Sequence, residues 1–450
     1  MYNNNYNYNS FVKSINDLQK KNNNQFQKKY QDLYTNNESN KKSFWTQDRN
    51  YIIPDLNLYG SSSLSSSFQN NLLPNKNYNT TIDENYYRKQ IYENNINNPN
   101  MNINAQKYLR DLNPIISSKV GLRNLGNSCY MNTCLQILMH SKDFIKRLLL
   151  KKPFINDRKT PITQQFLNIC ETVIKTNSNA IAPSDFQYIF CKKHSQFRLN
   201  YQYDIQEFCR VLLEDINREL NEGNNQAQYK ELNTEGKSKM QCAIEFDELY
   251  RKRESSIIID SFYAQIVNIF KCKKKNKNET YSFERILDLP LLLPNDSESF
   301  SLEELLNNYF LDEELKYNQK CKDCHRRKHI KEIKISSPPN ILILSLQRIN
   351  QRTQEKNKCK IKFGEQLNLQ SYIDEECGHK NECIYDLYAI GCHAGDMNFG
   401  HYFAYIKLND QDWYEFNDSK VNYIGDNYYN KSTCGYVYVL FYKKNTNINY

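Results

Sequence analysis

The sequence lacks any uninterrupted apolar run near the roughly eighteen residues that a membrane-spanning helix needs. It begins with MYNNNYNYNS, which has none of the basic-then-apolar order of a secretory signal peptide. These two absences argue against the common ways of reaching or crossing a membrane. We therefore expect no membrane partner and an intracellular location, in the cytoplasm, the nucleus or both.

Clustered basic charge is lacking as well. Sixty Lys and Arg stand against 51 Asp and Glu, which gives a net charge of +9. Residues 1–120 hold 14 basic and 9 acidic side chains, so their surplus is five and that of residues 121–450 is four. Such a dispersed surplus differs from the basic stripe of a nucleic-acid groove, and we expect no nucleic-acid partner.

Cysteine is missing from the first 128 residues, and all fourteen cysteines lie at or after Cys129. In a chain without a secretion signal, thiols of this number serve as core residues, metal ligands or a nucleophile rather than as disulfides. The sequence therefore predicts a reducing compartment.

The N-terminal region lacks a sustained apolar period. Residues 1–120 contain 28 asparagines, with a serine-rich run at 61–68. Such a composition buries too little apolar area to offset its conformational entropy, which predicts disorder over residues 1–118. Periodic apolar residues begin at Val120. We expect one domain over residues 119–445, long enough for a sizeable core, followed by a tail at 446–450.

Apolar spacing predicts helices early in this domain and strands late. Met131, Leu135 and Leu138 share one helical face, and Phe208, Val211, Leu212 and Asp215 mark a second helix. Strand patterns cover residues 257–259, 266–270, 341–346, 385–390, 401–406, 413–416 and 436–442. Helices followed by antiparallel-looking strands are typical of the α+β class.

The segment around Cys129 has the pattern of a nucleophile. Gly121 and Gly126 bracket a tight loop, and a helix follows at once, so Cys129 lies at or next to a helix N-terminus. The unpaired backbone N–H groups there favour thiolate over thiol. Asn124, five residues upstream, offers an uncharged donor for an oxyanion. Cys134, among apolar neighbours on the helix, fits an ordinary core cysteine instead.

A thiolate nucleophile needs an imidazole, and His401 is the best placed of the seven histidines. It begins an alternating strand, and the polar residues 408–412 separate this strand from the next. Folding the hairpin about residue 410 places His401 opposite roughly residue 419, next to Asn417 and Asp418. Either side chain can accept the imidazole N–H, and the spacing leaves open which one does.

Five motifs now stand in order along the chain. The first two are GLRNLGNSCYMNTCLQIL at 121–138 and QYDIQEF at 202–208. PNILILSLQR at 339–348, GHYFAYIK with WYEFNDSKV at 400–421, and YVYVLFY at 436–442 follow. Together they resemble the ubiquitin-specific proteases, a papain-like class of cysteine deubiquitinases.

The resemblance implies an α+β papain-like fold with thumb, palm and fingers, the fingers spanning about residues 240–335. It implies a thiol isopeptidase that cleaves after the C-terminal glycine of ubiquitin, with ubiquitin and ubiquitinated proteins as partners and no cofactor required. We expect a monomer. It implies that Cys129 is the nucleophile, His401 the base and Asn417 the third member of the triad. Asn124 would be the oxyanion donor, and Asp418 a second polarising group.

By the same resemblance, Asp204 and Glu207 would lie along the channel for the ubiquitin tail, whose arginines favour carboxylate partners. Without the family, acidic residues at a solvated helix N-terminus would explain both. His393, in a loop that flanks the channel, would be positional rather than catalytic.

The chain also departs from the family's pattern. Gln347 and Ile349 replace the usual Lys and Phe. The fingers of this family often carry two Cys-x-x-Cys zinc knuckles, but here only Cys321 and Cys324 form one, and the other is reduced to Cys272. His325 or His329 would have to complete a tetrahedral site. We expect a degenerate, metal-free finger, with structural zinc as the alternative; Cys377, His379 and Cys383 form a weaker candidate.

Two other functions compete with this interpretation. One is a catalytically silent scaffold that binds ubiquitin, and the other is a thiol protease for a different ubiquitin-like modifier. The complete set of Cys, His and two Asn argues against the scaffold. Active-site probes built on each modifier distinguish the three, because a scaffold is labelled by none.

Overall fold

The computed structural model describes residues 103–445 apart from 229, 231, 235, 273–274, 295–297, 317–327, 351–354, 378, 380–382, 397–399 and 430–434. The disorder predicted for the Asn-rich region therefore lies almost wholly outside the described residues, as does the tail. In this described part, no helix is both long and apolar enough to cross a membrane.

The described chain opens with two short helices, α3 (Ile103–Leu109) and α4 (Leu112–Ile116). Both pack against α6 (Lys142–Lys151), and Ile115 is fully buried there. Residues 103–116, which were predicted to be disordered, are therefore largely helical and packed on the domain. The Asn-rich composition around them hides an apolar pair, Ile115 and Ile116, that joins the core.

The thumb consists of helices that surround the buried helix α5. Every residue of α5 (Cys129–Met139) is buried, and this helix contacts α9, β14 and β15. Phe208 and Leu212 of α9 are fully buried, which confirms the predicted apolar stripe. The other helices of this part are η1 (Lys152–Phe154), α7 (Pro161–Lys175), α8 (Ser184–Lys193) and α9 (Ile205–Glu219).

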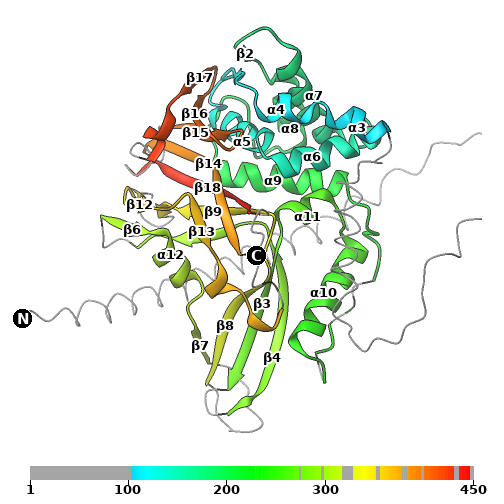
Figure 1. Cartoon of the computed structure of the whole chain (residues 1–450), viewed down its shortest axis with the longest axis vertical. Coiled ribbons are helices and arrows are strands. Elements are labelled where there is room, and N and C mark those ends of the chain that lie inside the picture. The colour runs from blue at the N-terminus through cyan, green and yellow to red at the C-terminus, as the bar shows by residue number, and fades with distance from the viewer. Residues whose placement is uncertain are drawn as a thin grey trace, which may run out of the picture. The chain divides into compact units, whose positions relative to one another are not determined.

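The palm is the larger sheet, with strand order β17-β16-β15-β14-β18-β9-β5 and β13 paired to β14 (Figure 1). Neighbours run antiparallel except β5 and β9, which are parallel. The strands are β5 (Leu289–Leu292), β9 (Ile341–Gln347), β13 (Gln366–Asn368), β14 (Ile384–Gly395), β15 (Gly400–Leu408), β16 (Asp412–Asn417), β17 (Lys420–Tyr423) and β18 (Val437–Lys444). The predicted strands in this region are confirmed.

The fingers are a four-stranded sheet of order β4-β3-β8-β7, which extends away from the thumb in Figure 1. Its strands are β3 (Ala264–Cys272), β4 (Lys275–Ile286), β7 (Glu313–Lys316) and β8 (Lys328–Ser337). Helix α10 (Lys239–Arg253) packs beside it, with the rings of Phe246 and Phe283 stacked 5.8 Å apart. The first strand of the sheet begins at Ala264, and the helix packed beside it begins at Lys239.

One predicted strand is wrong. Residues 257–259 lie in helix α11 (Ile257–Phe262), although three consecutive isoleucines favour a strand. The side chain of Ser256 accepts hydrogen bonds from the backbone N–H groups of Ile258 and Ile259 and so caps the helix. All three isoleucines are buried. The sequence here therefore shows no apolar–polar alternation that would distinguish a helix from a strand.

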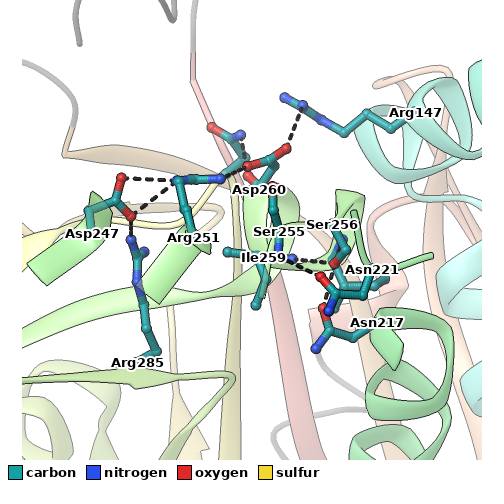
Figure 2. A network of polar contacts seen from close by, with 12 residues as sticks. Arg147, Asn217, Asn221, Asp247, Arg251, Ser255, Ser256, Ile259, Asp260 and Arg285 are labelled. Atoms are coloured by element: carbon teal, nitrogen blue, oxygen red, sulfur yellow. Dashed lines mark hydrogen bonds and ion pairs between the residues drawn. The ribbon is translucent and has the colours of Figure 1, made fainter. Parts of the chain in front are cut away.

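A network of ion pairs joins the thumb to the fingers (Figure 2). Arg251 Nη1 of α10 lies 2.7 Å from Asp260 Oδ1 of α11, and its Nε lies 2.9 Å from Asp247 Oδ2. Arg285 of β4 pairs with the same Asp247, and Arg147 of α6 lies 4.0 Å from Asp260. Four elements from both regions therefore share two carboxylates.

Short elements complete the domain. They are β1 (Gly121–Leu122), β2 (Ala180–Ile181), β6 (Ser299–Ser301), α12 (Leu302–Tyr309), β10 (Ile349–Asn350), β11 (Glu355–Lys356), β12 (Lys360–Lys362), η2 (Gln370–Tyr372), η3 (Glu375–Cys377) and η4 (Gly425–Asn427).

Candidate active site

Cys129 is the first residue of α5, as the sequence predicts. The loop before it turns through two left-handed residues, Gly126 with φ 92° and Asn127 with φ 53°. A Cβ on Gly126 would lie 2.1 Å from the side-chain oxygen of Asn200, so only glycine fits. The backbone N–H groups of Gly126 and Ser128 donate to Asn124 Oδ1, at 3.1 and 3.2 Å. This loop fixes the Cys129 thiol at the positive end of a helix.

His401 lies beside Cys129, in the register that the hairpin predicts. The ladder pairs Ala404 with Phe416, so His401 falls near the turn that holds residues 417–419. Its Nε2 lies 2.7 Å from Asn417 Oδ1, and because an amide oxygen only accepts, this nitrogen carries a proton. Asp418 Oδ2 is farther from Nε2, at 3.8 Å. The direct hydrogen-bond partner left open by the sequence is therefore Asn417.

The electrostatics of this group favour a charged imidazole. The hydrogen bond with Cys129 raises the pKa of His401 to about 9, against the lowering effect of burial and with further help from Asn417 and Asp418. The amide of Asn417 is itself oriented by Glu415, whose Oε1 accepts its N–H at 3.4 Å. At neutral pH the arrangement therefore holds an imidazolium next to the sulfur.

Asp418 connects the palm to the loop that carries the nucleophile. Its Oδ2 accepts an N–H from Asn124 at 2.9 Å, and its Oδ1 accepts one from Asn132 at 2.8 Å. Its backbone oxygen also accepts the N–H of Leu122, at 2.9 Å. One of the two amide hydrogens of Asn124 is thus used, and the second stays available for an oxyanion. Asp418 therefore mainly holds the palm to the nucleophile loop, a role that its position beside Asn417 does not suggest.

Gln202 is a site residue that its motif marked but to which the sequence assigned no role. Its Nε2 donates to the backbone oxygen of Gly400 at 2.5 Å and lies 3.6 Å from the sulfur of Cys129. The sequence signal that could have identified Gln202 is its position two residues before Asp204, just ahead of α9. Gln202 joins the strand of His401 to the nucleophile.

The two acidic residues predicted to line the tail channel lie one turn apart at the start of α9 and differ in exposure. Asp204 is the N-cap of α9, and its Oδ1 accepts the N–H groups of Gln206 and Glu207 at 2.7 and 3.2 Å. The Tyr438 hydroxyl donates to its other oxygen, and burial raises the pKa of this carboxyl. Glu207, one turn later, is exposed. Of the two residues, Glu207 is the more exposed.

His393 lies inside the palm, at the end of β14. It is 3% exposed, and its ring lies 4.3 Å from that of Tyr402. Burial, together with the charges of Lys356 and His401, lowers its pKa to about 4, so the ring is neutral. A Cβ on Gly400 would lie 2.0 Å from its Nε2. His393 therefore packs against the residue that precedes His401.

Only some of the candidate zinc ligands are among the described residues. The backbone of Cys272 pairs across the fingers sheet with that of His329. Cys321, Cys324 and His325 lie outside the described residues. Among the residues that are described, no three His, Cys, Asp or Glu side chains could together hold a metal ion. Cys377 of the weaker candidate is buried in an apolar cluster.

Comparisons with known proteins agree with this geometry. The sequence profile of the family described as ubiquitin carboxyl-terminal hydrolase matches residues 120–442. Ubiquitin carboxyl-terminal hydrolase Usp2 of Drosophila melanogaster is 28% identical over 337 residues, which cover 72% of this chain and 34% of that protein. Human ubiquitin carboxyl-terminal hydrolase 21 is 28% identical over 362 residues, 73% of this chain and 62% of that protein. The chain thus spans about a third to under two thirds of these relatives.

The fold has solved counterparts. A chain of the SAGA Ubp8/Sgf11/Sus1/Sgf73 DUB module bound to ubiquitin aldehyde superposes with a TM-score of 0.59 and 23% identity, covering 74% of this chain and 70% of that one. The same module bound to monoubiquitin gives a TM-score of 0.59 with 20% identity, covering 81% and 76%. The fold is therefore the α+β papain-like fold of these enzymes. Because the family profile covers well over half of its length, the chain belongs to the ubiquitin-specific proteases of the ubiquitin carboxyl-terminal hydrolase family.

Proposed function

We propose that the protein is a thiol isopeptidase that hydrolyses the bond after the C-terminal glycine of ubiquitin on protein conjugates. The observation that carries the proposal is the arrangement of Cys129, His401 and Asn417, in which the pKa of His401 is raised to about 9 mainly by its hydrogen bond with Cys129. A charged imidazole next to a helix N-terminus stabilises the thiolate. Family membership supplies the substrate class.

In the proposed mechanism the Cys129 thiolate attacks the carbonyl carbon of the terminal glycine. The free N–H of Asn124 and the backbone N–H groups of the loop hold the oxyanion. His401 then protonates the departing lysine amine as the C–N bond breaks, which leaves the glycine acylated on Cys129. Water, deprotonated by His401, hydrolyses the thioester and restores the thiolate.

The ubiquitin tail would meet the two acidic residues differently. Glu207 is exposed and supplies a carboxylate for an arginine of the tail. Asp204 shapes the channel from within, because its oxygens already accept the capping N–H groups and the Tyr438 hydroxyl. His393 supports the channel edge as a neutral, buried ring.

Catalysis in this family needs no cofactor, and we propose that the finger holds no structural zinc. The backbones of Cys272 and His329 pair in the fingers sheet, and the second sulfur of the Cys272 knuckle is absent from the sequence. Three thiolates are one short of a tetrahedral sulfur site. We further propose that the protein acts as a monomer inside the cell, where Cys129 stays reduced.

The first experiment is reaction of the purified protein with ubiquitin that carries a thiol-reactive group at its C-terminus, followed by mass mapping of the adduct. We expect one adduct, on Cys129, and none in Cys129→Ala. Cys134→Ala is the matched control, because Cys134 lies five residues along the same helix, is fully buried and has a pKa raised by burial. It should label like the natural chain.

Other outcomes would redirect the proposal. Tight binding of ubiquitin without an adduct would identify a scaffold. An adduct with a probe built on another ubiquitin-like modifier, and none with ubiquitin, would identify a different substrate. Turnover of a ubiquitin conjugate by Cys129→Ala would show that another residue is the nucleophile.

A further inference from the structure

A lysine of the hairpin β10–β11 reaches the end of strand β14. The ammonium of Lys356 donates to the backbone oxygen of His393 at 2.7 Å and to that of Gly395 at 2.9 Å. Both acceptors are main-chain carbonyl groups. The neighbouring carboxylate of Asp396 pairs instead with Lys358, at 2.7 Å, and that pair is largely exposed.

The two carbonyl groups are available to Lys356 because β14 extends beyond the end of its neighbour β18. The ladder between β14 and β18 ends at Cys392 and Val437, and the N–H of His393 then donates to the backbone oxygen of Tyr436 at 2.7 Å. Carbonyl groups two residues apart on a strand face the same edge. Lys356 therefore supplies the donors that a longer β18 would have supplied to His393 and Gly395.

The residues that Lys356 holds lie directly across from the catalytic strand. The ladder between β14 and β15 pairs Ala394 with His401, and Gly395 with Gly400. Ala394 is the residue between the two carbonyl groups that Lys356 contacts. A displacement of this strand end therefore moves the residue opposite His401.

A second set of contacts leads from the same strand end to the nucleophile. His393 packs so closely on Gly400 that a Cβ there would lie 2.0 Å from its Nε2. The backbone oxygen of Gly400 accepts the Gln202 amide, which in turn lies 3.6 Å from the Cys129 sulfur. Both halves of the catalytic pair thus connect to the segment that Lys356 holds.

We propose that Lys356 is a positioning residue for hydrolysis. By holding the end of β14, it keeps His401 and Gly400 of the adjacent strand where the imidazole can pair with Cys129. The inference rests on the proposed function for its activity measurement. It assigns Lys356 no contact with the reacting atoms.

Replacing this lysine leaves no charge unpaired. Burial and the nearby charges of Arg348 and Lys358 lower the pKa of Lys356 to about 8. A methionine at the position has a similar length, and it removes a cation from cationic surroundings. The variant Lys356→Met should therefore fold and lose only the two hydrogen bonds.

The test compares Lys356→Met and Lys356→Arg with the matched control Lys358→Met, whose ion pair on the same segment is exposed. Turnover of ubiquitin with a fluorogenic C-terminal amide gives kcat and KM. The rate of Cys129 alkylation by iodoacetamide, followed against pH by peptide mass mapping, reports the thiolate–imidazolium pair without ubiquitin. Thermal unfolding of each variant measures stability.

We expect Lys356→Met to lower kcat about tenfold, with KM within about twofold, and to shift the pH profile of Cys129 alkylation. Lys356→Arg should keep kcat within about threefold, and Lys358→Met should match the natural chain. Natural kcat and an unchanged alkylation profile in Lys356→Met would overturn the inference. So would a loss of activity that follows only a loss of the folded state. If the natural chain alkylates normally yet cleaves no ubiquitin conjugate, the proposed function fails, and the alkylation profiles alone decide the role of Lys356.

Discussion

The adjacent residues Asn417 and Asp418 should fail in opposite ways when each is replaced. Asn417→Ala removes the 2.7 Å hydrogen bond to His401 Nε2 and nothing that joins the thumb to the palm. A hydrogen bond to a charged group contributes about 2 kcal/mol, which corresponds to roughly a thirtyfold loss in kcat. Asn417→Asp keeps an acceptor at the same position and should retain activity within about threefold.

Asp418→Asn is the second half of the comparison, because asparagine tolerates the left-handed backbone at this position, where φ is 49°. The new NH2 group faces one of the two amide donors, Asn124 or Asn132, so one charge-assisted hydrogen bond is lost. We expect the free energy of unfolding to fall by about 2 kcal/mol. The change in kcat should be smaller than in Asn417→Ala, because Asp418 Oδ2 lies 3.8 Å from His401 Nε2 and the side chain of His401 is 41% exposed.

Urea unfolding and steady-state turnover of a fluorogenic ubiquitin amide measure both effects on the same preparations. The expected result is a stable but slow Asn417→Ala and a less stable but more active Asp418→Asn. If Asp418→Asn instead lost as much kcat as Asn417→Ala at unchanged stability, Asp418 would be the residue that holds His401. The assignment from the two distances would then be wrong.

Three further predictions concern pH, a buried ion pair and metal. Because the pKa of His401 is about 9, kcat/KM for an isopeptide should fall as pH rises through that value and the imidazolium loses the proton needed by the leaving amine; a rate that is flat to higher pH would contradict this. Lys239→Met should lower the unfolding free energy by about 3 to 5 kcal/mol, since it leaves the buried Asp374 without the ammonium 2.9 Å away; a loss below about 1 kcal/mol in urea unfolding would refute it. Chelator treatment should change neither the melting temperature nor turnover, and elemental analysis that found one zinc per chain would reverse our proposal for the finger.

Local signals predicted the catalytic hairpin well. Alternation from His401 onward and a short polar turn fix the register, and the register places Asn417 within reach of the ring. The glycine-bracketed loop likewise fixes Cys129 at the first position of a helix. Both inferences use only residues that are close in sequence, where turn chemistry and side-chain period decide the structure.

Contacts between segments far apart in the sequence could not be predicted from such local patterns. No pattern near Asp418 indicates that it bonds Asn124 and Asn132, which lie 294 and 286 residues earlier. Asp204 has the expected position at the start of a helix, yet the inward turn of its carboxylate depends on Tyr438 from the last strand. Pairings of this kind arise from the packing of thumb on palm, and that packing is not encoded in either segment alone.

Two kinds of interaction contribute to this domain: helix α5 is wholly buried at the catalytic end, and shared ion pairs help to join the fingers to the thumb. Dissolved salt screens exposed charges but leaves apolar burial intact or stronger. The side chains of Arg251 and Asp247 are both partly exposed, so added salt should weaken this ion pair more than it weakens the burial of α5. As ionic strength rises, the fingers should therefore be held less firmly to the thumb, while the packing around α5 persists.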